Sequence, residues 1–554
     1  MNYGFVIDNR KCIGCHACTV ACKSEHDVAI GVNRTWVKYI EKGEFPNSRR
    51  YFSVMRCNHC EKAPCVDICP VSALHFRDDG IVDFDNRRCI GCKSCMQACP
   101  YDALYIDPNT HTAAKCNYCA HRVDIGLNPA CVNICPEQAI IAGDLDDSQS
   151  AISQLIAREQ VTARKVEKGT VPNLYYIDAD ISSITPSAAP PQTTYTQAQQ
   201  TAGVGHFAHY AEKRLSAADK HKMAEELAKS ASYSQQESPE DYGVTVPISN
   251  NGGNGKVMEK AWAVVQETVQ RVYDAPSKGA VWGWEVSAYV WTKAIAAGAF
   301  LLPFLYELFK PGQLPEEMLW AGSVLSLVFL TLTGMLLIKD LDKPTRFLYV
   351  LLRPQKKSWL VRGGYAITVF GGLVTLWMVW RFLGLRELEP VIITAALVFS
   401  VIVAVYTAFL FGQAKGRDFW QSPALAPHML IHAFMAGSAV FSLLISWVWP
   451  QSTLGGFFAS ALLYSLLINI AILAVELLAA HPTTDAKLTV QMIVSGRFRI
   501  LFWAGTVVVG NLLPLLMLGT QEAALFAPAA VLVLIGMYVT EHIWVRAPQL
   551  VPLS

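Results

Sequence analysis

The sequence predicts two folds in one chain: an α+β domain built by duplication at the N-terminus, and an all-α polytopic membrane domain after it. Two observations predict this division. All 16 cysteines lie between Cys12 and Cys135, and residues 281–554 hold repeated apolar runs that are long enough to cross a bilayer. A chain of 554 residues is expected to form two or three domains. Its formal net charge of +1 gives no indication of nucleic acid as a partner.

The cysteines fall into four arrays with short, regular spacing. The arrays are Cys12, Cys15, Cys18 and Cys22; Cys57, Cys60, Cys65 and Cys69; Cys89, Cys92, Cys95 and Cys99; and Cys116, Cys119, Cys131 and Cys135. The third array has the full Cys-x2-Cys-x2-Cys-x3-Cys-Pro pattern of bacterial ferredoxins. In that pattern three close thiolates hold one cluster, and the fourth binds the other cluster of a pair. Sixteen cysteines therefore supply the ligands of four [4Fe–4S] clusters.

Two other uses of cysteine fit these arrays less well. A disulfide framework also needs an even number of cysteines, but it does not group them in fours at fixed short spacing. Zinc sites use Cys-x2-Cys pairs, yet rarely three cysteines at intervals of three followed by Cys-Pro. Between the arrays, residues 80–85 and 103–107 are predicted strands. The fold expected for residues 1–181 is thus a duplicated bacterial-ferredoxin domain.

The order and spacing of the arrays resemble the iron–sulfur subunits of the DMSO reductase and polysulfide reductase type, which connect a molybdopterin enzyme to the membrane. The resemblance covers about residues 1–180. In that family the first array pairs with the fourth and the second with the third. The implied ligand sets are Cys12/Cys15/Cys18/Cys135, Cys22/Cys116/Cys119/Cys131, Cys57/Cys60/Cys65/Cys99 and Cys69/Cys89/Cys92/Cys95. The resemblance also implies that the last of these clusters lies nearest the membrane.

Basic and aromatic side chains among the cysteines could tune cluster potentials through charge and hydrogen bonds. They are His16, His59, Arg87, Arg88, Tyr118 and His121. For any single one of them, a solvated or packing role is the favoured interpretation.

The region between the two predicted domains changes composition to Ser, Thr, Ala, Gln, Pro and Gly. Residues 182–257 are therefore predicted to be a flexible linker, with a polar helix over about 211–231. Apolar residues at helical spacing between Met258 and Tyr273 then predict an interfacial helix within residues 258–280.

Eight candidate spans follow in the membrane domain, 281–554. They cover roughly 286–306, 318–338, 364–380, 390–411, 428–449, 456–479, 500–518 and 524–543. Thirteen Lys and Arg residues flank the spans on the side of the iron–sulfur domain, and three on the other side. The positive-inside rule therefore predicts a multi-pass protein of the bacterial inner membrane, with its iron–sulfur domain in the cytoplasm. The first residues show no export signal, which agrees with this orientation.

Several motifs of this domain resemble the NrfD-type membrane subunit of polysulfide reductase. They are the run from Asp340 to Phe347 (DLDKPTRF), Ser358-Trp-x2-Arg-Gly-Gly364, Tyr406-Thr-x2-Leu410 and Gly496-x6-Trp503. That family implies a haem-free quinone site near the membrane surface, with menaquinone or ubiquinone as the exchangeable partner. The histidines agree with the expected absence of haem, because His428, His432, His481 and His542 all lie at or near predicted span ends.

Ionisable residues inside spans are costly and usually functional. The candidates for hydrogen bonding and proton exchange with quinone are Tyr406, Asp340, Lys293, His432 and Glu476, with Tyr289 and Trp282 as binding residues. Under the predicted topology all of them lie toward the cytoplasmic ends of their spans. The alternative for each is an interfacial anchor. That alternative is favoured for Glu285 and Glu541.

These inferences predict an electron-transfer and membrane-anchor subunit of a respiratory oxidoreductase complex. It would pass electrons between a separate catalytic subunit, of the molybdopterin type by resemblance, and the quinone pool of the lipid bilayer. The sequence has no recognisable pterin, flavin or nicotinamide site of its own. Two alternatives stay open: an anchor of a hydrogenase or formate dehydrogenase, and a cluster-bearing membrane sensor or assembly factor that does not turn over quinone.

Overall fold

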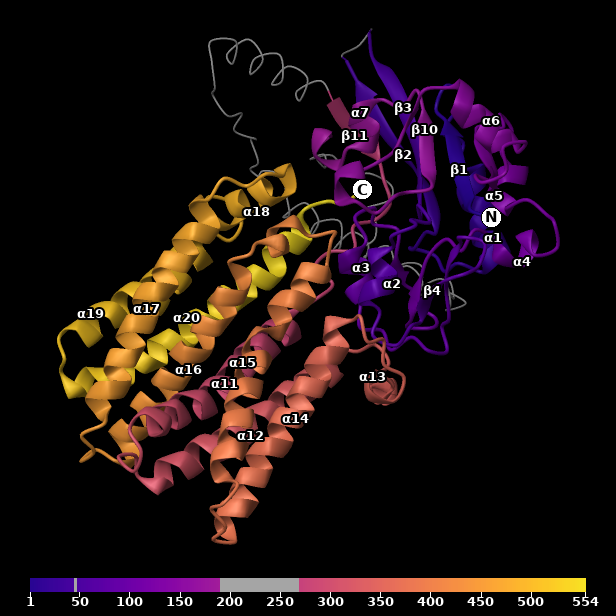
Figure 1. The fold of residues 1–554 in the computed structure, drawn as a ribbon. Coiled ribbons are helices and arrows are strands. Elements are labelled where there is room, and N and C mark those ends of the chain that lie inside the picture. Colours follow the sequence, from indigo (N-terminus) through magenta and orange to yellow (C-terminus); the bar gives the residue numbers. More distant parts are fainter. Residues whose placement is uncertain (44–46, 190–268) are drawn as a thin grey trace, which may run out of the picture. The chain divides into compact units, whose positions relative to one another are not determined.

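The computed structural model describes residues 1–43, 47–189 and 269–554 (Figure 1). The chain divides into two compact units. The first contains residues 1–281 and 551–554, and the second contains residues 282–550. The predicted helix over 211–231 and most of the predicted linker lie outside the described residues.

The first unit contains a four-stranded sheet in the order β8-β1-β10-β9. Its strands are β1 (Tyr3–Asp8), β8 (Ile140–Asp144), β9 (Val161–Thr162) and β10 (Leu174–Ile177). Strand β1 pairs parallel with β10 and antiparallel with β8. Both faces of β1 are covered: Phe5 and Ile7 pack among the cysteine loops, and Val6 packs against Ile152 of helix α6 (Ala151–Arg158). This explains why three apolar residues, Phe5, Val6 and Ile7, follow one another in this strand.

A second sheet has the order β11-β2-β3, with β2 (Thr35–Lys42), β3 (Arg49–Arg56) and β11 (Val269–Tyr273). The predicted interfacial helix is wrong for residues 269–273, because these residues pair antiparallel with β2. Val269 and Val272 are β-branched and suit a strand, and their spacing of three had imitated a helical pattern. Residues 258–268 of that predicted helix lie outside the described part.

The cysteine arrays lie on loops and on short helices that follow them. These helices are α1 (Ala17–His26), α2 (Pro64–Ile68), α3 (Ser94–Ala98), α4 (Ala120–Val123) and α5 (Ala130–Asn133). Two small hairpins separate the arrays, β4 (Leu74–Phe76) with β5 (Val82–Phe84) and β6 (Tyr105–Ile106) with β7 (Ala113–Ala114). The predicted α+β class is confirmed.

The described part of the predicted linker is ordered. Helix α7 (Ile181–Ile184) and the 3₁₀ turn η2 (Pro186–Ala188) follow β10 closely, and η1 (Val166–Lys168) precedes it. The Asp180 side chain caps α7 by accepting a hydrogen bond from the Ser182 backbone N–H. Ser183 is buried, and its hydroxyl bonds with Ser53 of β3 at 2.7 Å. A flexible linker starting at residue 182 is therefore contradicted for residues 182–189, since polar composition did not reveal these buried contacts.

The second unit is all-α and has eight helices that are long and apolar enough to cross a membrane, as predicted. The long helices are α11 (Trp284–Phe309), α12 (Glu316–Lys339), α14 (Trp359–Phe382), α15 (Glu389–Gln413), α16 (Leu425–Val448), α17 (Gly455–Leu478) and α20 (Phe526–Arg546), and a π-helical segment η7 (Leu501–Leu512) that continues as α19 (Leu513–Gly519). Shorter elements are α13 (Tyr349–Leu352), α18 (Thr484–Val494) and the 3₁₀ turns η5 (Pro344–Arg346), η6 (Asp418–Gln421), η8 (Ala523–Leu525) and η9 (Ala547–Leu550).

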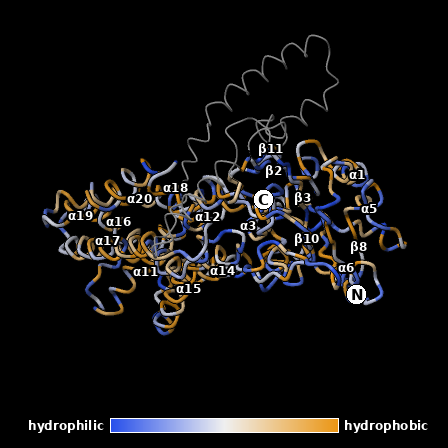
Figure 2. Tube along the Cα trace, turned by 90° about the horizontal axis from the view of Figure 1, so that it is seen from above, coloured by the Kyte–Doolittle hydropathy of each residue, from blue (hydrophilic) through white to orange (hydrophobic). Residues whose placement is uncertain are grey.

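Helix α11 lies at the centre of this bundle and packs against α12, α15, α16 and α20. The buried share of its most apolar stretch is 83%, against 28% for α12 and α14. Gly298 of α11 and Gly437 of α16 let these two helices approach closely, because a Cβ on Gly298 would lie 1.9 Å from the Ala433 carbonyl oxygen. Figure 2 shows hydrophobic residues along the helices of this unit. Val328 and Leu332 of α12 and Val369 and Leu376 of α14 are exposed, as expected of helices that face lipid.

Candidate functional site

All four cysteine loops share one backbone feature. The residue before the second cysteine has a positive φ in each array: 71° at Gly14, 42° at His59, 71° at Gly91 and 62° at Tyr118. This left-handed conformation is free for glycine and costly for His and Tyr. Turns of this kind aim successive backbone N–H groups into one concavity, which suits an anion. The repeated turn indicates four equivalent binding loops.

The structure brings the cysteines together in the four nested sets that the resemblance implied. Cys12, Cys15, Cys18 and Cys135 line one cavity, and Cys69, Cys89, Cys92 and Cys95 line another. Cys22 lies near Cys116, Cys119 and Cys131, and Cys65 lies near Cys57, Cys60 and Cys99, which agrees with the other two sets.

The surroundings of these cysteines fit an anionic iron–sulfur cluster. The backbone N–H groups of Ala73 and Ala139 donate to Cys69 Sγ and Cys135 Sγ, both at 3.2 Å, in matching positions four residues after the cysteine. Burial raises the pKa of Cys18 to about 11. Bound iron would hold such a thiol as the thiolate that ligation requires.

Two basic side chains that the sequence analysis did not select contact cysteine sulfurs. Arg56 Nη1 donates to Cys131 Sγ at 3.1 Å, and His26 Nε2 lies 3.1 Å from Cys119 Sγ. The only sequence signal for Arg56 was its place directly before Cys57.

The basic and aromatic residues that were selected have other partners. His59 Nδ1 accepts the Val82 N–H at 3.3 Å, Tyr118 Oη donates to the Gly4 carbonyl oxygen at 2.6 Å, and the His121 ring bonds with Glu25 at 2.7 Å. His16 packs against Tyr39 and Tyr273. These contacts support the packing role that was favoured for them.

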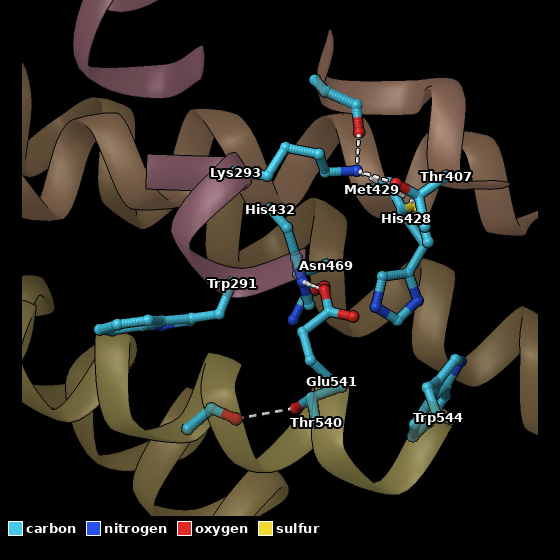
Figure 3. Close-up of polar contacts among 12 residues, drawn as sticks. Trp291, Lys293, Thr407, His428, Met429, His432, Asn469, Thr540, Glu541 and Trp544 are labelled. Carbon is cyan, nitrogen blue, oxygen red and sulfur yellow. Dashed lines mark hydrogen bonds and ion pairs between the residues drawn. The ribbon is translucent and has the colours of Figure 1, made fainter. Parts of the chain in front are cut away.

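In the membrane unit, Lys293 joins two helices. It lies on α11, is fully buried, and its Nζ donates to Thr407 Oγ1 at 2.7 Å and to the Ala404 carbonyl oxygen at 2.9 Å, both on α15 (Figure 3). The same ammonium lies 4.9 Å from the centre of the Tyr406 ring. The structure therefore brings together two of the predicted residues, Lys293 and Tyr406, and adds Thr407.

A glycine of α14 makes room for the Tyr406 ring. A Cβ on Gly363 would lie 2.2 Å from two ring carbons of Tyr406, so only glycine allows this contact without a shift. The motif Ser358-Trp-x2-Arg-Gly-Gly364 and the motif that begins at Tyr406 thus meet in space.

Two histidine–carboxylate pairs lie in the same unit. His432 Nδ1 and Glu541 Oε1 are 2.7 Å apart (Figure 3). His428 Nδ1 and Glu476 Oε2 are also 2.7 Å apart. Trp544 Nε1 donates to Glu476 at 3.0 Å. The two imidazole rings, on successive turns of α16, are 4.3 Å apart and meet edge to face.

These pairs correct one expectation and extend the candidate set. Glu541 had been interpreted as an interfacial anchor, but it is buried and bonded to His432. Helix packing decides this, because α20 turns Glu541 inward toward α16. Side-chain atoms of His428, His432 and Glu541 all lie within 4.8 Å of one another. His428 and Glu541 are thus the site residues that sequence reasoning missed or placed wrongly.

The remaining predicted residues lie on or next to α11 and α12, and Tyr289 lies beside Thr407, Tyr406 and Asp340. Tyr289 is buried on α11, one turn before Lys293. Asp340 is half-buried at the end of α12. Trp282 is buried in an aromatic stack with Trp420 at 5.6 Å, and Gln549 bonds with its backbone N–H and carbonyl.

A polar chain also accompanies the π-helical segment. Asn469 of α17 donates to Asn511 Oδ1 at 2.9 Å, and Asn511 donates to the Thr506 carbonyl oxygen at 2.8 Å. The Asn511 side chain thus donates a hydrogen bond to a backbone carbonyl of the π-helical segment itself. π-Helical turns are rare in proteins, and those that occur often lie near functional sites.

Comparison with known protein families agrees with this architecture. Residues 274–552 match the family model described as polysulphide reductase, NrfD, which is half of the chain. Residues 11–74 and 49–145 match two models described as 4Fe-4S dicluster domains.

Individual relatives match about a third of the chain. A tetrathionate reductase subunit of Salmonella typhimurium is 43% identical over 189 residues, which cover 33% of this chain and 75% of that protein. Protein NrfC of Escherichia coli is 44% identical over 181 residues, covering 32% and 81%. Thiosulfate reductase electron transfer subunit PhsB of Salmonella typhi is 40% identical over 176 residues, covering 31% and 91%.

Proposed function

Because this chain belongs to the NrfD polysulphide reductase family and carries 4Fe-4S dicluster domains ahead of that region, we propose that it transfers electrons between a separate catalytic subunit and membrane quinone. Two relatives are named as subunits of reductases, and one of these names specifies electron transfer. Their names support a catalytic partner on another chain, and the family resemblance favours a molybdopterin enzyme as that partner.

The observation that carries this proposal is the gathering of all 16 cysteines into four complete sets. Each set supplies the four thiolates of one [4Fe–4S] cluster, which exchanges one electron when it is bound. Twelve of the 16 cysteines are buried, and the backbone N–H groups of the loops offset negative charge on sulfur. Four sets in one domain suit electron transport over a distance better than sensing.

We place the quinone reaction in the membrane unit, at Lys293 and Tyr406. An ammonium has three donors, and two of them at Lys293 already bond with Thr407 and the Ala404 carbonyl. The third faces Met429 Sδ at 4.0 Å, a weak acceptor that a quinone carbonyl oxygen could replace. The Tyr406 hydroxyl is a second donor beside it.

Quinone reduction also needs protons, and we assign their exchange to the histidine–carboxylate pairs. His432 Nε2 is buried and has no hydrogen-bond partner in the part of the chain that the structure describes. With Glu541 bonded to its Nδ1, this imidazole can accept or release a proton at Nε2. The second pair, His428 with Glu476, lies directly beside it.

The asymmetry of basic residues, thirteen against three, supports a cytoplasmic location of residues 1–281 at a bacterial inner membrane.

Two substitutions test the quinone proposal. Tyr406→Phe removes one hydroxyl, so folding should survive while oxidation of reduced clusters by a ubiquinone or menaquinone analogue slows. Glu541→Gln keeps the shape of the side chain and removes the ionisable partner of His432, so proton-coupled turnover should fall more than quinone binding. Both variants should still accept electrons from the catalytic partner. Unchanged quinone turnover in both would show that the site is placed wrongly, and loss of clusters would show a structural role.

A further inference from the structure

Arg56 is a fully buried cation between two of the cysteine sets. It ends strand β3, is 0% exposed, and its guanidinium carbon lies 4.5 Å from the centre of the Phe5 ring. Its Nη1 donates to Cys131 Sγ at 3.1 Å. Its charge also acts on Cys116 of the same set and on Cys18 of the neighbouring set.

The remaining donors of this guanidinium face no acceptor within residues 1–43, 47–189 and 269–554. Nε and Nη2 are buried without a hydrogen-bond partner among the residues that the structure describes. An unpaired buried charge is strongly destabilising. The counter-charge must therefore come from thiolates and from the group that they bind.

Another buried arginine of the same unit shows the contrast. Arg164 is equally buried, but its Nε and Nη2 donate to the carbonyl oxygens of Ile184 and Leu553, at 3.1 and 3.2 Å. Its Nη1 lies 3.1 Å from Met55 Sδ. Arg164 thus bonds with the protein itself through all three nitrogens, whereas Arg56 directs its charge at cysteines.

A second side chain bonds with the same cysteine set. His26 Nε2 lies 3.1 Å from Cys119 Sγ, and Cys119 joins Cys22, Cys116 and Cys131. Two of the four sulfurs in this set therefore have a side-chain nitrogen within hydrogen-bonding distance.

We propose that Arg56 raises the reduction potential of the cluster held by Cys22, Cys116, Cys119 and Cys131. This inference rests on the proposed function, because it assumes a cluster in that set. Reduction adds one negative charge to an already anionic cluster, and a nearby buried cation stabilises the reduced form more than the oxidised form. Hydrogen bonds to the sulfurs act in the same direction. Because of Arg56, this cluster is reduced more readily, and it holds an electron on the path between the catalytic subunit and quinone.

The test is a potentiometric titration of the whole membrane protein, followed by electron paramagnetic resonance. Arg56→Gln removes the charge and should lower the midpoint of one cluster signal, so that its ratio of reduced to oxidised cluster at the wild-type midpoint falls at least tenfold (about 59 mV for one electron). Arg56→Lys keeps a positive charge but not the same hydrogen bond. Its midpoint for that signal should therefore lie between those of the wild type and Arg56→Gln. His26→Gln should shift the same signal in the same direction, and Arg164→Gln, the matched buried arginine, should shift none.

Iron analysis separates the two levels of this inference. About eight irons per chain in the wild type, instead of about sixteen, would overturn the four-cluster proposal itself. With full iron, an unchanged midpoint in Arg56→Gln would overturn the role of Arg56. If Arg56→Gln loses its clusters, Arg56→Lys and His26→Gln test the role of Arg56 instead. A lower midpoint of the same cluster signal in both variants supports that role. Unchanged midpoints, or shifts of two different cluster signals, contradict it.

Discussion

Gly363→Ala tests whether the position of Tyr406 matters for quinone turnover. The added Cβ would lie 2.2 Å from two ring carbons of Tyr406, whereas ordinary contact begins at 3.4 Å. The ring must therefore retreat by about 1.2 Å, the difference between these distances. A misplacement of about 1 Å in a reacting group can reduce a rate by about a hundredfold. We expect a loss of this size in the rate at which quinone oxidises the reduced clusters.

The stability cost of this substitution should be small. Overpacking costs about 1–3 kcal/mol, and replacing a mid-helix glycine with alanine returns about 1 kcal/mol. Gly364→Ala is the matched control, because its Cβ would meet only Val350 Cγ1, at an ordinary 3.6 Å. The assay is stopped-flow bleaching and recovery of the iron–sulfur absorbance, with reduction by dithionite as the check on cluster integrity. Equal quinone rates in the two variants would refute the assignment of Tyr406.

Three further outcomes follow from the account. Anaerobically purified protein should contain about sixteen irons per chain and essentially no zinc; stoichiometric zinc would contradict the cluster assignment. Reporter fusions after Ser554 should score as cytoplasmic and fusions within residues 381–389 as periplasmic, because of the basic asymmetry; the reverse pattern would place the clusters outside the cytoplasm. Lys293→Met keeps the length of the side chain but removes the ammonium, so quinone affinity should fall while the iron content stays at the wild-type value; loss of iron in this variant would argue against a local role.

The sequence predicted features that depend on local pattern. Cysteine spacing identified the cluster-binding fold, and runs of apolar residues identified the eight spans. Strand β11 was missed because its partner β2 lies more than two hundred residues away in the chain, and no local pattern reports such a pairing. The valines at 269 and 272 fit a helix and a strand equally well.

Residues of the candidate site were predicted only where the residue type alone shows that burial in a membrane span costs free energy. A lysine in the middle of an apolar run draws attention, and Lys293 is indeed fully buried. Glu541 lies near the end of its span, so its burial depends on which face of α20 packs against α16. Arg56 was missed for a related reason: its contact with Cys131 crosses 75 residues of sequence, and only the folded domain brings them together.

Electron exchange between the clusters of this chain and quinone can be measured directly. The full chain is placed in lipid vesicles without a catalytic partner, and its clusters are reduced with a stoichiometric amount of dithionite. A menaquinone or ubiquinone analogue is then added, and the iron–sulfur absorbance is followed. The account predicts that the clusters are oxidised at about 1–1,000 per second, the usual range of enzyme turnover. Clusters that react with dithionite but stay reduced in the presence of both quinones would contradict it.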